Sequence, residues 1–145
     1  MARAGQWKCG PAIRAGREDS GTAAVEFAFV APIFLLFMVG ILFYGSYFGA
    51  VHMVQQIAAD AARASVAGVT DTERASLAQA RATSDIAAFS LLNPQGVTVQ
   101  VSQSTGSVQV TVTYDPSYLA VWPLAKLVPA PSGLITRVSA IDAGV

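Results

Sequence analysis

The sequence has few charged residues, one cysteine and one histidine. Charged side chains make up 12% of the 145 residues, whereas a soluble domain usually carries about 25%. The single cysteine, Cys9, excludes an intramolecular disulfide, and its place before the apolar run argues against a lipid-attached cysteine. The single histidine, His52, has no cysteine or carboxylate at ligand spacing, which argues against a metal site and against Ser-His-Asp catalysis. No glycine-rich phosphate loop precedes a helix. The sequence therefore predicts no cofactor and no enzymatic activity.

The missing charge is concentrated in one stretch. From Phe27 to Val51 there are 25 residues without a charged side chain. As a helix they would be roughly 37 Å long, enough to cross a hydrocarbon core of about 30 Å. Tyr44 and Tyr47 fall near the far end, where interfacial aromatic residues are common. This pattern predicts one transmembrane helix over residues 22–51.

The residues before this helix form a basic leader. Over residues 1–21, four basic side chains stand against two acidic ones, which gives a net charge of +2. A basic flank predicts a cytoplasmic N-terminus, with residues 52–145 outside the cytoplasmic membrane. The leader is too short and too mixed in sign to predict nucleic-acid binding. A cleaved secretory signal is the main rival, but its apolar region should be about 7–15 residues long and would not normally begin at Glu26.

Helical periodicity continues beyond the predicted span. Residues 52–69 predict an extension of the first helix whose buried face carries Val54, Ile57, Ala61 and Ser65. Thr70 and Glu73 have the spacing of a capping box and predict the start of a second helix that runs to about Leu92. Its apolar side is predicted to carry Leu77, Ala80, Ala87 and Leu91.

The last third of the chain changes to the periodicity of strands. Valines alternate with polar residues over 97–102 and again over 108–113, which predicts a β-hairpin with one buried face. Residues 134–141 are predicted to form a third strand. Four prolines over 116–131 exclude a central strand there. The predicted fold class is α+β: a long N-terminal transmembrane helix, a second helix and a short antiparallel sheet.

The most informative motif precedes the apolar run. Residues 20–27 read Ser-Gly-Thr-Ala-Ala-Val-Glu-Phe, with Gly21 five residues before Glu26. Glycine lets a backbone become extended in a protease cleft, whereas a carboxylate deep in a bilayer costs about 2.5–3.5 kcal/mol on insertion scales. Glu26 could pair with an amine of a neighbouring subunit, or it could simply be favoured near a helix N-terminus by about 0.3–1 kcal/mol. The residues alone leave both readings open.

The motif resembles the processing site of type IV pilin-like proteins. The longer segment Gly-Thr-Ala-Ala-Val-Glu-Phe-Ala-Phe-Val-Ala-Pro is similar to the TadE-like proteins of tight-adherence (Flp) pilus systems, over about residues 20–60. The resemblance implies that a prepilin peptidase cuts between Gly21 and Thr22. It also implies that Glu26 and Phe27 act in assembly.

Three further features of the sequence remain ambiguous. Pro32 removes one helix hydrogen bond, which either only kinks the helix or is covered by neighbouring helices. Glycines at 40, 45 and 49 could allow close helix packing, but glycine is common in membrane helices. The segment 118–128 is strongly apolar and too short to span. It either packs over the sheet or forms a partner or membrane surface around Tyr118 and Trp122.

The resemblance implies a minor pilin, or pseudopilin, that takes part in pilus assembly and adhesion. Its implied partners are other pilins, the prepilin peptidase, the pilus assembly platform and the lipid bilayer. A mature chain of residues 22–145 is long for such systems, whose major pilins are very short. Two alternatives remain open: an uncleaved single-pass scaffold of the secretion machinery, and a secreted binding domain released by signal peptidase.

Overall fold

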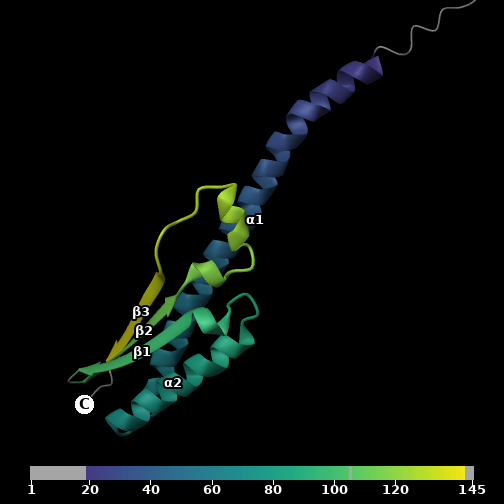
Figure 1. Ribbon diagram of the computed structural model, residues 1–145. Coiled ribbons are helices and arrows are strands. Elements are labelled where there is room, and N and C mark those ends of the chain that lie inside the picture. Colours follow the sequence, from purple (N-terminus) through teal and green to yellow (C-terminus); the bar gives the residue numbers. More distant parts are fainter. Residues whose placement is uncertain (1–18, 105, 143–145) are drawn as a thin grey trace, which may run out of the picture. The chain divides into compact units, whose positions relative to one another are not determined.

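The computed structural model describes residues 19–104 and 106–142, so most of the predicted leader lies outside the described residues. The long helix α1 spans Asp19–Ser65 and the second helix α2 spans Asp71–Ala88. The remaining elements are η1 (Pro94–Gly96), β1 (Val97–Ser104), β2 (Ser107–Tyr114), η2 (Pro116–Tyr118), η3 (Trp122–Lys126) and β3 (Ile135–Asp142). Figure 1 shows these elements along the chain. The predicted α+β class is confirmed. The chain divides into two compact units between Leu36 and Phe37.

Three antiparallel strands form the sheet in the order β1-β2-β3, with β2 in the centre. Val110 pairs with Val101 on one side and with Ser139 on the other. The predicted hairpin is confirmed, and the predicted third strand is shifted by one residue. Gly106 lies in the hairpin turn with φ of 81°, a conformation that favours glycine. The proline-rich segment forms η2 and η3 between β2 and β3 and no strand, in agreement with the lack of an N–H on each proline.

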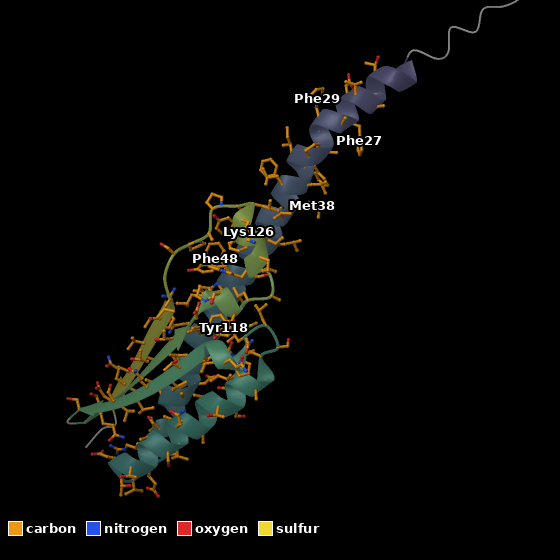
Figure 2. The ribbon with its side chains drawn as sticks, viewed as in Figure 1. Phe27, Phe29, Met38, Phe48, Tyr118 and Lys126 are labelled. Atoms are coloured by element: carbon orange, nitrogen blue, oxygen red, sulfur yellow. The ribbon has the colours of Figure 1, made fainter. Side chains whose placement is uncertain are left out.

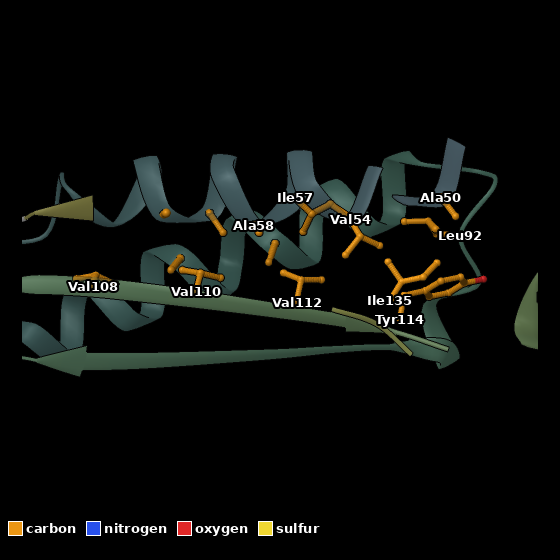
Figure 3. Packing of buried hydrophobic residues seen from close by; sticks show 14 of the residues in the cluster. Ala50, Val54, Ile57, Ala58, Leu92, Val108, Val110, Val112, Tyr114 and Ile135 are labelled. Atoms are coloured by element: carbon orange, nitrogen blue, oxygen red, sulfur yellow. The ribbon is translucent and has the colours of Figure 1, made fainter. Parts of the chain in front are cut away.

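The core lies between one face of the sheet and the two helices (Figure 3). The central strand contributes four side chains that are almost fully buried: Val108, Val110, Val112 and Tyr114. The predicted buried face of α1 is confirmed, because Val54, Ile57, Ala61 and Ser65 are each 0% exposed. Small alanines between the larger side chains let the helices approach one another closely.

Substitution of the buried Ile57 tests how much this core contributes to stability. Its side chain is 0% exposed, so Ile57→Ala should lower the free energy of unfolding by about 2–5 kcal/mol through lost burial and a residual cavity. Val66→Ala is the matched control, since Val66 is 51% exposed and should change stability by less than about 0.5 kcal/mol. Denaturant unfolding of the detergent-solubilised chain measures both. Equal effects of the two substitutions would contradict this core assignment.

The start of α2 was predicted correctly, but its end and its buried face were not. Thr70 and Glu73 form the capping box. The helix ends at Ala88 instead of Leu92. The predicted face is wrong because Ala80 and Ala87 are exposed, whereas the buried residues are Ala78, Ala82 and Asp85. In an alanine-rich helix, apolar periodicity discriminates poorly between faces.

An ionic network explains which face of α2 is buried. Arg81 Nε donates to Asp85 Oδ2 at 3.0 Å, and Arg81 Nη2 lies 3.7 Å from Asp60 Oδ2 on α1. Asp60 also pairs with Arg63. A carboxylate can be buried when such partners satisfy its charge. The alanines beside Asp85 then pack against the core without steric hindrance.

Candidate processing and assembly segment

The part of α1 from Phe27 to Leu36 is apolar on every side. The exposed fractions are 71% for Phe27 and 73% for Phe29, and these two side chains stand away from the helix in Figure 2. Ile33 and Phe34 are also exposed, by 59% and 60%. A helix that is hydrophobic all round requires an apolar surrounding. Within the described residues, one helix is long and apolar enough to cross a membrane, over Gly21–Ser65.

The peptide bond between Gly21 and Thr22 lies in the first turns of α1, which begins at Asp19. The first N–H groups of a helix lack intrahelical partners, so this is the end from which α1 can unwind most easily. A Cβ atom added at Gly21 would meet nothing within 4 Å. A side chain at this position would therefore be accommodated by the fold.

Glu26 is the only Asp, Glu, Lys or Arg residue between Asp19 and Asp60, and its side chain is exposed. Thr22 and Glu26 are four residues apart, so they lie on the same face of α1. Cleavage before Thr22 would create an amine one helical turn from this carboxylate. Phe27 follows immediately and points to a different side of the helix.

The three glycines of the helix have different surroundings. A Cβ added at Gly40 or Gly45 would meet nothing within 4 Å, whereas one at Gly49 would lie 3.2 Å from Cδ2 of Leu91. Gly49 thus serves packing inside this chain. Gly40 and Gly45 remain open to another helix. Pro32 lies inside α1 and its side chain is exposed.

The two predicted partner-surface residues also differ. Tyr118 is 45% exposed and packs over Gly96, whose added Cβ would lie 2.9 Å from Tyr118 Cδ2. Trp122 is half-buried, and its ring centroid lies 5.9 Å from that of Phe43 on α1. The segment around Trp122 therefore packs against the helix. Phe43 is fully buried, although it lies within the predicted membrane span.

Two titratable groups lie where β2 leads into η2. Burial raises the pKa of Tyr114, an effect that the nearby Asp115 carboxylate reinforces and the Asn93 backbone N–H opposes. Hydrogen bonds from the Ser117 hydroxyl and backbone N–H lower the pKa of the Asp115 carboxyl. The stabilisation from Asp115 is therefore present above the ordinary carboxyl pKa and is lost as the pH falls through the lowered one. Neither group belongs to a cluster that could hold a metal within the described residues.

Comparison with known proteins gives a family match for part of α1. Residues 21–63 match the family model described as TadE-like protein. The match begins at Gly21 and ends two residues before the end of α1, so α2 and the sheet lie outside it. No curated protein and no solved structure matches the chain.

Proposed function

We propose that this chain is a TadE-like protein of a tight-adherence pilus system and acts there as a minor pilin, because residues 21–63 match the TadE-like family model. In this proposal a prepilin peptidase cuts between Gly21 and Thr22. The mature protein then takes part in pilus assembly and adhesion through α1 and the attached domain. The observation that supports this proposal most directly is that the family model matches the helix that contains Gly21, Thr22 and Glu26.

The exposed apolar surface of α1 and the charge of the leader support insertion into a membrane before assembly. The turns of α1 over Phe27 to Leu36 expose apolar side chains all round, and the basic leader favours a cytoplasmic N-terminus. The sheet and α2 would then lie outside the cytoplasmic membrane. The bilayer, other pilins, the prepilin peptidase and the assembly platform are the partners in this proposal. The protein would be the substrate of an enzyme and would have no catalytic role.

Intact mass tests the processing step. The protein extracted from membranes with the cognate prepilin peptidase present should begin at Thr22, and without the peptidase it should keep residues 1–21. A mature chain that begins elsewhere would contradict the proposed cleavage site. A full-length chain in both membranes would favour the uncleaved scaffold, because a scaffold of the secretion machinery needs no free N-terminus at residue 22.

A further inference from the structure

A short segment of the domain lies against α1 inside the predicted membrane span. We call residues 122–129, which comprise η3 and the three residues after it, the strap. Two contacts fix it on the helix: the Trp122 ring lies 5.9 Å from the Phe43 ring, and the Tyr44 hydroxyl donates to the Pro129 carbonyl at 2.5 Å. In Figure 2, Lys126 lies beside α1 between the levels of Met38 and Phe48.

The apolar side chains of α1 on the N-terminal side of these contacts are largely exposed. Met38, Ile41 and Leu42 are 45%, 71% and 57% exposed, whereas Phe43 is fully buried. Exposure of such apolar side chains to water is unfavourable. Among the described residues of α1, Phe43 is the first that the domain buries fully, so the contacts of α1 with the domain begin at this turn.

The strap carries the side chains that the headgroup layer of a bilayer favours. Trp122 of the strap and Tyr44 of the adjoining turn of α1 contribute amphipathic rings, and Trp and Tyr are enriched at the membrane interface. Leu127 is 62% exposed with no covering within the described residues. The exposed Lys126 beside it can extend its ammonium group to water while its stem stays in apolar surroundings.

The length of the helix gives the same boundary. Eighteen residues separate Glu26, whose charge favours one membrane edge, from Tyr44. At 1.5 Å per residue this corresponds to about 27 Å of helix, close to the hydrocarbon thickness of about 30 Å. The strap therefore meets α1 where the hydrocarbon core should end, about two turns before Val51, the end of the uncharged run.

We propose that the strap is an interfacial anchor, with Leu127 and Trp122 seated in the lipid headgroup layer. This inference rests on the proposed membrane span. It makes the bilayer a binding surface for the folded domain, which would sit directly on the membrane and not at the end of a free helical stalk. Lipid is favoured over a protein partner because the exposed strap adjoins the turns of α1 whose apolar side chains are exposed.

Depth-dependent fluorescence quenching tests this anchor. In a Cys9→Ser background, Leu127→Cys and Lys126→Cys place a polarity-sensitive label on the strap. Leu134→Cys is the matched control, because Leu134 is also a 62% exposed leucine and precedes β3. Val69→Cys, between α1 and α2, and Ile33→Cys, in the span, complete the set. Each full-length protein is reconstituted into phosphatidylcholine vesicles that contain lipids spin-labelled at the headgroup or deep in the acyl chain.

The strap labels should lose fluorescence roughly twofold or more with the headgroup quencher, while the labels at positions 134 and 69 should hardly change. Quenching at 126 and 127 no greater than at 134 would overturn the anchor. If the Ile33 label is nevertheless quenched by the deep spin label, the membrane span survives that result. An Ile33 label insensitive to deep quenchers would refute the span, and the anchor with it. Protection of position 127 from soluble iodide only after addition of other pilus proteins would assign this surface to a protein and overturn the lipid proposal.

Discussion

Gly21→Leu should leave the chain uncut, with residues 1–21 retained. A Cβ at this position meets nothing within 4 Å, so the substitution should not disturb the fold. Leucine is also a good helix former, whereas glycine is poorer by about 1 kcal/mol. The substitution would therefore stabilise the turn that a protease must unwind, and it would place a bulky side chain in the cleft. Both effects oppose cleavage.

The matched control is Gly40→Leu. Gly40 lies in the same helix and also has open space around a new Cβ, so the two variants share the chemical change and differ only in position. Intact mass from membranes that contain the peptidase should show Gly40→Leu fully processed and Gly21→Leu full-length. Normal processing of Gly21→Leu would contradict the proposed role of this glycine. A processing defect in Gly40→Leu would instead implicate insertion of the helix.

The elements that were predictable from sequence are those in which one pattern dominates. The valine alternation over 97–101 and 108–112 has the period of a half-buried strand, and the structure places both runs in one sheet. The capping box at Thr70 was equally clear, because it satisfies backbone donors locally. The face of α2 was not predictable, since the pairing of Asp85 with Arg81 decides it and alanines give little contrast.

The candidate segment was predictable in part. A short linear motif singles out Gly21 and Glu26, whose roles stay predictions. The use of Gly49 for packing against Leu91 could not be predicted, because the contact joins residues far apart in the chain. The segment 118–128 was identified as a packing segment over the sheet or as a partner or membrane surface, but its contact with α1 could not be predicted for the same reason. Its prolines exclude a strand, but only the fold shows that Trp122 lies on Phe43 within the uncharged run. The signal that sequence did offer was an aromatic, lysine-bearing apolar segment too short to span.

Glu26→Ala should be inserted and cleaved yet fail to assemble. Removal of the carboxylate should not hinder insertion, because a charge costs about 2.5–3.5 kcal/mol at the centre of a membrane helix and less at the membrane edge, where Glu26 is expected. In an assembled filament, Glu26 is proposed to accept a hydrogen bond from the new amine of a neighbouring Thr22. Hydrogen bonds to charged groups contribute about 1.5–3 kcal/mol. The loss of one per subunit contact should weaken that contact by about tenfold or more.

The size of the assembly defect distinguishes pairing of Glu26 with an amine from a simple interaction with the helix dipole. If Glu26 only interacts with the helix dipole, its loss costs about 0.3–1 kcal/mol and should weaken assembly by no more than about fivefold. Glu73→Ala is the control, because Glu73 is an acidic residue in the first turn of α2 and its loss has a similar local cost. Glu26→Asp should be intermediate, since it keeps the charge on a shorter stem. Quantified pilus protein on cells, compared with mature subunit in membranes, measures each variant. Assembly of Glu26→Ala at the level of Glu73→Ala would exclude the pairing and leave only the dipole effect.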